Sequence, residues 1–194
     1  MKQYLRSITI IAMIGILAGP LQAETFKIDR GHSHIGFTIR HIFAQVSGRF
    51  TDFSGTVEYD SQNVEKLAVD VVVQAKSINT DNEGRDRDLR SPNFFNADSF
   101  ATLRFKSTKA YKTKEGVFLE GKLTIKDSTK DIRIPVEILG MGGSGDHMVA
   151  GFHSSFKIDR KDYGIVWNRK LDMGGMLLGD DVTISVDIEA NNRK

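Results

Sequence analysis

The chain has 194 residues, 27 of them Lys or Arg and 25 of them Asp or Glu, and it contains no cysteine. The lack of cysteine excludes disulfide bonds, thiolate metal sites and a thiol nucleophile, so burial of apolar side chains must stabilise the fold. The near-balanced charge gives no electrostatic argument for nucleic-acid binding, which depends on clustered Lys and Arg.

The first 23 residues have the pattern of a secretion signal. Lys2 and Arg6 precede an apolar run at residues 8–17, and Ala23 ends a stretch typical of a cleavage site. The run is shorter than the roughly 20 residues that a membrane-spanning helix needs. We therefore predict that residues 1–23 are removed, which leaves one domain at residues 24–190 and a solvated tail at 191–194. The product is predicted to be soluble and periplasmic, without a transmembrane segment.

Most of the remaining chain alternates apolar and polar residues, as half-buried strands do. In residues 34–40, for example, Ile35, Phe37 and Ile39 face one way. The pattern predicts strands at residues 25–28, 34–40, 46–60, 67–74, 102–108, 117–125, 132–138, 148–158 and 181–190. Pro135 cannot donate to a ladder, so we expect its strand to lie at an edge or to be bulged there.

The alternation stops at one charged stretch, for which we predict a short helix at Thr80–Ser91. Thr80 and Glu83 have the spacing of a capping box, and Pro92 disfavours helix at the residue before it. Phe94 and Phe95 follow directly. We interpret the stretch as a helical plug whose two aromatic rings pack into the rest of the domain.

About eight antiparallel strands without crossover helices imply a sandwich or a closed barrel. The long strands with interior glycines, such as Gly48 and Gly55, favour a curved and closed sheet. We predict an all-β antiparallel barrel of about eight strands, with the helix Thr80–Ser91 at one end. The interior of such a barrel is either filled by side chains or holds one ligand, and the composition does not choose between the two.

Three groups of residues suggest chemistry. His32 and His34 are two residues apart and could chelate zinc or copper, although a structural role fits better and no metal site is expected. The guanidinium groups of Arg85 and Arg90 suit the oxygens of a head group, although neighbouring acids compete for them. An enzyme could use Arg85, Asp86 or His34 for acid–base steps, but no nucleophile elbow or phosphate-binding glycine loop is present, so we do not expect an enzyme.

A series of short motifs, in order along the chain, resembles the YceI-like family of polyisoprenoid-binding proteins. The motifs are His32-Ser33-His34-Ile35-Gly36-Phe37, Gly48-Arg49-Phe50, Phe53-Ser54-Gly55, Ser77-Ile78-Asn79-Thr80, Arg85-Asp86, Leu89-Arg90-Ser91, Phe94-Phe95, Phe105-Lys106-Ser107, Gly121-Lys122-Leu123-Thr124-Ile125, Ile158-Asp159-Arg160 and Asp162-Tyr163-Gly164. They extend over most of residues 24–190.

The resemblance implies a lipocalin-like barrel with an elongated apolar pore that holds a long isoprenoid chain, such as a quinone tail or a polyprenyl lipid. It implies a carrier without a cofactor or an established enzymatic activity. We expect the pore to be lined by Phe37, Phe53, Phe94, Phe95, Phe105, Leu119, Tyr163 and Trp167, with Arg85 and Arg90 near the head group. A homodimer is compatible with the pattern, although no strand edge points to one.

Overall fold

The computed structural model describes residues 23–144 and 147–193, so all of the predicted signal except Ala23 lies outside the described residues. Eleven strands form one sheet: β1 Glu24–Ile28, β2 His34–His41, β3 Ala44–Phe50, β4 Phe53–Tyr59, β5 Ala68–Gln74, β6 Ile78–Asn79, β7 Thr102–Thr113, β8 Gly116–Ile125, β9 Ser128–Ser144, β10 His147–Asp159 and β11 Leu178–Asn191. The helices are α1 Glu83–Arg90 and the short 3₁₀ turns η1 Arg30–His32, η2 Val64–Lys66, η3 Ala75–Ser77 and η4 Arg160–Tyr163. Within the described residues, no helix has the length and apolar character to cross a membrane.

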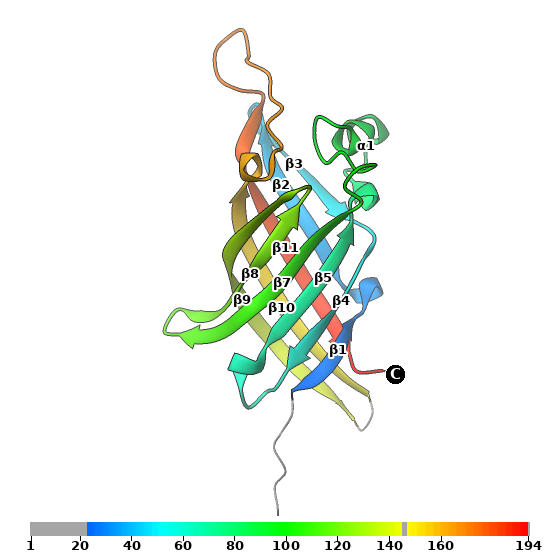
Figure 1. Cartoon of the computed structure of the whole chain (residues 1–194), viewed down its shortest axis with the longest axis vertical. Coiled ribbons are helices and arrows are strands. Elements are labelled where there is room, and N and C mark those ends of the chain that lie inside the picture. The colour runs from blue at the N-terminus through cyan, green and yellow to red at the C-terminus, as the bar shows by residue number, and fades with distance from the viewer. Residues whose placement is uncertain (1–22, 145–146, 194) are drawn as a thin grey trace, which may run out of the picture.

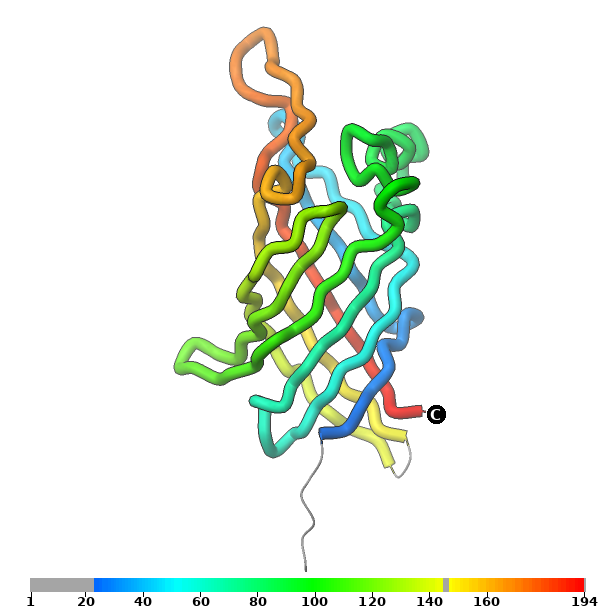
Figure 2. The backbone as a smooth tube through the Cα atoms, viewed as in Figure 1, coloured from blue at the N-terminus to red at the C-terminus, as the bar shows by residue number. Residues whose placement is uncertain are grey.

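The sheet closes into a barrel, as predicted. Eight strands follow one another in the order β1-β4-β5-β7-β8-β9-β10-β11, and β11 pairs again with β1. All of the pairings are antiparallel, and Figures 1 and 2 show the tilted strands wrapping around one axis. The all-β barrel with one helix is therefore confirmed.

Strand β11 is long enough to pair with two partners on one edge. Ala190 and Asn191 pair with β1, whereas the stretch before them pairs with β2. The turn η1 lies between β1 and β2, where the chain passes from the pair Ile28 and Ala190 to the pair His34 and Asp187 on β11. The pairing of Asn191 places the first residue of the predicted tail in β11, and the side chain of Asn192 accepts a hydrogen bond from the N–H of Met148.

The predicted strand 46–60 is two strands, β3 and β4, separated at Thr51 and Asp52. The N–H of Thr51 donates to the carbonyl of Ser77, and the carbonyl of Asp52 accepts from the N–H of Gln74. These hydrogen bonds to distant residues fix the chain between β3 and β4. The alternation of apolar and polar residues in 46–60 carries no sign of them.

Pro135 was predicted to mark an edge or a bulge, but β9 is an interior strand between β8 and β10. The ladder between β9 and β10 runs only as far as the pair Glu137 and His153, so Pro135 lies just past its end. The hydroxyl of Ser154 donates to the carbonyl of Pro135 at 2.6 Å. The proline is tolerated because the β9–β10 ladder has ended, so no carbonyl of β10 needs a backbone N–H from residue 135.

The helix α1 begins at Glu83, and its cap is not the predicted capping box of Thr80 and Glu83. The side chain of Asn82 accepts from the N–H of Arg85 instead. The hydroxyl and the N–H of Thr80 both donate to the buried carboxylate of Asp86. The helix ends at Arg90, as the following Ser-Pro pair indicates.

Side chains fill the end of the barrel opposite α1. Three alanines of one core cluster, Ala110, Ala150 and Ala190, are almost fully buried, and the last two are paired in register. The rings of Tyr59 and Phe152 pack edge to face there, with centroids 5.4 Å apart. This end is therefore a solid core.

Candidate functional site: an apolar cavity inside the barrel

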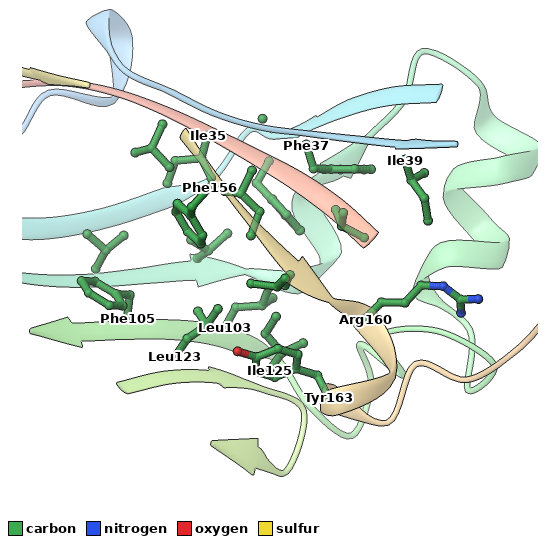
Figure 3. A pocket seen from close by; sticks show the side chains of 18 of the residues that line it. Ile35, Phe37, Ile39, Leu103, Phe105, Leu123, Ile125, Phe156, Arg160 and Tyr163 are labelled. Carbon is green, nitrogen blue, oxygen red and sulfur yellow. The ribbon is translucent and has the colours of Figure 1, made fainter. Parts of the chain in front are cut away.

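The barrel encloses a cavity of about 580 Å³ in its other half. This volume is within the range of roughly 300–1,000 Å³ that is typical of ligand sites. Figure 3 shows aliphatic and aromatic side chains pointing into the cavity from several strands. The wall includes Ile35, Phe37, Ile39, Val71, Leu103, Phe105, Leu123, Ile125, Phe156, Val182, Ile184 and Val186.

The cavity reaches the surface at the α1 end, because its wall there includes exposed residues. Exposed Asp88 and Asn93 come from α1 and the segment after it, exposed Trp167 follows η4, and half-buried His41 comes from the end of β2. The other end closes on Leu119 and its neighbours in the solid core. The site is a blind, apolar pocket with one polar mouth.

The two phenylalanines after α1 pack into this mouth, as the sequence predicts for a plug. The ring of Phe95 packs edge to face on Phe50, with centroids 5.8 Å apart. The ring of Phe94 lies 5.4 Å from that of Trp167. The helix is fixed to β6 through Thr80, to which Arg85 donates two hydrogen bonds at 2.8 Å.

A buried arginine organises the opposite side of the mouth. Arg160 is only 3 % exposed, and its guanidinium donates to the carbonyls of Gly179, Ile165 and Trp167 and to the carboxylate of Asp180. Burial lowers the pKa of Arg160, and the charge of Asp180 opposes that shift. These bonds hold residues 164–168 across the barrel end.

Tyr163 lies next to this arginine and is 2 % exposed. It belongs to a cluster with Leu123, Ile125 and Ile165, and the turn η4 that carries it contacts both β9 and β10, whose ladder ends at Glu137 and His153. Burial, with a smaller effect of the Asp162 charge, raises the pKa of Tyr163 to about 12. The phenol is therefore neutral at physiological pH.

Seven of the eight expected pore residues lie on the cavity wall: Phe37, Phe94, Phe95, Phe105, Leu119, Tyr163 and Trp167. The eighth, Phe53, is instead buried in a cluster with Phe50 and Ile78. Of the two head-group candidates, Arg85 reaches the cavity wall. Arg90 donates to the carbonyls of Lys76 and Ile78, which places it away from the cavity.

The sequence did not single out Arg160 as a residue of the mouth. It occurs in a motif that carries the family resemblance, but an arginine in a turn is ordinarily expected in solvent. Its burial follows from a loop, residues 164–177, whose carbonyls turn toward it. No local pattern shows that.

The two histidines proposed for a metal do not converge. His32 lies in η1, with Nδ1 3.1 Å from a carboxylate oxygen of Asp29 and 3.7 Å from one of Glu189. His34 is exposed on β2 and is paired in register with Asp187. The hydrogen bond from His32 lowers the pKa of Asp29, and Asp29 in turn raises the pKa of His32. The arrangement is that of an exposed ion pair.

The residues of the enzyme alternative are also separated. Asp86 is buried beneath Thr80, outside the cavity wall, and His34 lies on the outer surface. Among the three, Arg85 alone reaches the cavity. These residues do not share a site in which a substrate could contact all of them.

A closed eight-stranded barrel with a helix at one end and a blind apolar cavity defines this chain as a barrel protein with an internal site for an apolar ligand. Residues 26–190 match the model of the YceI-like domain. The chain belongs to that family.

Known relatives agree with this assignment. A UPF0312 protein of Photorhabdus laumondii is 33 % identical over 187 residues, which cover 90 % of this chain and 95 % of that protein. The crystal structure of Burkholderia cenocepacia BcnA has a TM-score of 0.72 at 19 % identity and covers 84 % of this chain and 99 % of its own. A polyisoprenoid binding domain from Saccharophagus degradans, implicated in plant cell wall breakdown, has a TM-score of 0.61 at 12 % identity and covers 88 % and 99 %. At these identities the two structures support the fold.

Proposed function

We propose that this protein is a periplasmic carrier that holds the chain of a polyisoprenoid-type lipid, such as the tail of an isoprenoid quinone or a polyprenyl lipid. The observation that carries the proposal is the blind apolar cavity with a single mouth. The likeness to a polyisoprenoid binding domain supports the choice of ligand. No step of catalysis is part of the proposed role.

The energetics suit a carrier. Burial of apolar surface contributes about 25 cal/mol per Å², so a few hundred Å² of lipid chain contributes several kcal/mol before the costs of association. The mouth then decides which head groups are accepted. The rings of Phe37 and Phe105 offer the flat apolar contacts that a prenyl chain fits.

Native mass spectrometry of the protein purified from its own periplasm, followed by organic extraction, tests this function. We expect a stoichiometric adduct that resolves into a prenyl-chain lipid, on a chain that begins at Glu24. A bare chain that takes up neither an added quinone nor an added prenyl lipid would contradict the proposal.

A pair of adjacent valines gives a matched control. Val71 lies on the cavity wall, whereas the neighbouring Val72 points to the other face of β5. Val71→Trp fills the cavity and should abolish the adduct, and Val72→Trp should retain it. Equal lipid content in the two variants would show that the lipid binds elsewhere.

A further inference from the structure

The hydroxyl of Tyr163 has no hydrogen-bond partner among the described residues, although the side chain is 98 % buried. Among the described residues no fully buried side-chain nitrogen or oxygen lacks a partner, so this oxygen keeps a little accessible surface and is not sealed within protein. A tyrosine hydroxyl ordinarily forms a hydrogen bond, and here the partner must come from the open space beside it. Figure 3 shows where this oxygen points: into the cavity, among apolar side chains that include Leu123 and Ile125. It is therefore a polar group presented to whatever fills the cavity.

The surroundings decide which chemistry this hydroxyl can serve. Arg160 also lines the cavity, but in Figure 3 its guanidinium points away from the Tyr163 oxygen, and its nitrogens donate to three carbonyls and to Asp180. Arg85 lies across the mouth on α1. A phosphate at the depth of Tyr163 would thus be desolvated without a cation beside it, which is strongly unfavourable. An uncharged oxygen has no such cost.

The phenol is also a donor at every physiological pH, since its pKa is raised to about 12. A carbonyl or ether oxygen has only lone pairs to offer, and a hydroxyl can accept as well as donate. These groups match a neutral phenol held in apolar surroundings.

On the basis of the proposed function, we infer that the cavity contains a polar subsite in which Tyr163 donates a hydrogen bond to an uncharged oxygen of the lipid. The lipid class is then a prenyl chain with a neutral oxygen-bearing head, such as a quinone. The lipid head enters the barrel as far as Tyr163, and the prenyl tail occupies the deeper part of the cavity.

The substitution Tyr163→Phe tests this, because it removes the hydroxyl and keeps the ring. The probes are a ubiquinone and squalene, a prenyl hydrocarbon without oxygen, both titrated in the same detergent. We expect the dissociation constant for the quinone to rise about 3- to 10-fold, as for the loss of one hydrogen bond, and that for squalene to stay the same or fall. The carbonyl stretch of the bound quinone, measured by infrared difference spectroscopy, should shift in the native protein and lose that shift in the variant.

The outcomes separate this inference from the proposed function. Unchanged quinone affinity and an unchanged carbonyl stretch in Tyr163→Phe would overturn the subsite while leaving the carrier intact. Failure of the native protein to bind either probe would overturn the carrier itself. A polyprenyl phosphate that binds more tightly than the quinone and weakens equally in Tyr163→Phe would overturn the restriction to uncharged heads.

A second observation, independent of Tyr163, concerns the outside of the mouth. Five large apolar side chains are exposed there: Phe43 and Met173 at 97 %, Val166 at 63 %, Met176 at 43 % and Trp167 at 36 %. We call these five residues the mouth rim. They belong to the β2–β3 connection and to residues 164–177, which lie at the same end of the barrel in Figure 1.

Hydrogen bonds tie the two segments of the mouth rim together. The N–H of Ile42 donates to the carbonyl of Leu177 at 2.8 Å, and Arg40 donates to the carbonyls of Ile42 and Met176. Neither Arg169 nor Lys170 forms an ion pair with a described residue. The loop combines exposed apolar side chains with uncompensated cations, and the cavity opens beside it.

We further infer that the mouth rim docks on the surface of a lipid bilayer that contains anionic lipids. Apolar and aromatic side chains enter the acyl boundary while flanking Arg and Lys meet the head groups, as in proteins that bind the interface. Asp172 is the one acid in residues 164–177, so the loop keeps an excess of positive charge. Docking there would bring the cavity mouth to the lipid source.

Flotation with vesicles of phosphatidylcholine, with and without phosphatidylglycerol, tests the docking. We expect binding that is stronger with the anionic lipid and that falls at least 10-fold in the Phe43→Ser, Met173→Ser double variant. Arg169→Gln with Lys170→Gln should remove the preference for anionic lipid. Leu139→Ser with Met141→Ser, which changes exposed apolar residues on β9, should leave binding unchanged.

Absence of vesicle binding by the native protein would overturn the docking. So would a concentration-dependent dimer, seen by light scattering, that Phe43→Ser abolishes, because the mouth rim would then be a contact between copies of this chain. Quinone affinity in detergent is measured in parallel and is expected to be the same in all of these variants.

Discussion

At the scale of single residues, the mouth of the cavity depends on Arg160. Its side chain is more buried than that of any other arginine or lysine among the described residues for which an ion pair is given, and each of its hydrogen-bonding nitrogens has a partner. The planar fork of a guanidinium can reach three carbonyls and a carboxylate at once, whereas an ammonium cannot. Arg160 therefore determines the course of the loop that follows it.

We expect Arg160→Lys to lower the free energy of unfolding by about 2–4 kcal/mol, because buried carbonyls such as those of Ile165 and Trp167 lose their donors. Lys161→Ala removes the other cation that pairs with Asp180. Because the Lys161 side chain is 44 % exposed, this substitution should lower the free energy of unfolding by less than about 1 kcal/mol. Urea unfolding of both variants measures the difference. Equal losses would mean that the charge of Asp180, and not the carbonyl bonds, is what matters.

The ion pair of Asp29 and His32 predicts a pH dependence at the barrel surface. The pKa of His32 is raised above its ordinary 6.5, so its stabilisation is complete below that value and is lost as the pH rises through the raised pKa. The pKa of Asp29 is lowered from 3.8, so its stabilisation is present above that value and is lost as the pH falls through the lowered pKa. In an NMR titration, Asp29→Asn should bring the pKa of His32 back toward 6.5. A titration curve of His32 that Asp29→Asn leaves unchanged would contradict the pairing.

The residues that sequence reasoning could find are those whose role follows from an alternating pattern. Phe37, Phe105 and Leu119 are on the inward face of their strands, which the period of two predicts. Phe53 keeps the same period but lies at the start of β4, where the segment around Ile78 covers it. Such covering by a distant segment has no signature in the neighbouring residues.

At the scale of elements, strands β7 and β8 show how tightly the cavity wall is built. A β-carbon on Gly121 would lie 2.6 Å from the carbonyl of Lys106 and 2.7 Å from the ring of Phe105. The register of the two strands shifts between Ser107 and Lys109, directly across from this glycine. The glycine thus allows the Phe105 ring to lie flat on its neighbour strand.

Gly121→Ala should therefore destabilise the fold by about 1–3 kcal/mol, as overpacking does, and should also weaken lipid binding through displacement of the Phe105 ring. Gly142→Ala is the matched control in β9, since nothing lies within 4 Å of its β-carbon, and should change stability by less than about 0.5 kcal/mol. Thermal unfolding followed by circular dichroism compares the two. Equal stabilities would show that the wall relaxes around an added methyl group.

Most elements were predictable from alternation, and the misplaced boundaries have physical causes. The break between β3 and β4 is held by bonds to η3, and the helix cap moved to Asn82 because Thr80 bonds Asp86. In both cases a polar group forms a hydrogen bond with a residue that the local sequence pattern does not indicate. Competition of this kind is not visible along the chain.

At the scale of the whole molecule, barrel closure was predictable but the fate of the interior was not. Composition is the same for a packed core and for a tunnel, and only the layout of side chains distinguishes them. Small residues such as Ala150 and Ala190 are buried in the packed core at one end, whereas larger side chains such as Phe156 line the cavity at the other end. One barrel thus combines a solid half with a hollow half.

A hollow barrel should be stabilised by its ligand. Removal of bound lipid by organic extraction should lower the unfolding temperature, and quinone at about 100 times its dissociation constant should restore roughly 5–10 °C. Val71→Trp, with its cavity filled, should unfold at the same temperature with and without the lipid. If lipid does not change the unfolding temperature of the native protein, the cavity does not bind it.

The short ladder between β9 and β10 gives the barrel a seam. Below the pair Glu137 and His153 the wall is a continuous hoop of backbone hydrogen bonds, which cannot widen without breaking one. Above that pair β9 and β10 have no backbone ladder, and they are joined by the side-chain hydrogen bond from Ser154 to the carbonyl of Pro135 and by the apolar packing of the Tyr163 cluster. Side-chain packing yields by small displacements at little cost, so the upper barrel can expand around a bulky passenger while the lower barrel keeps its circumference.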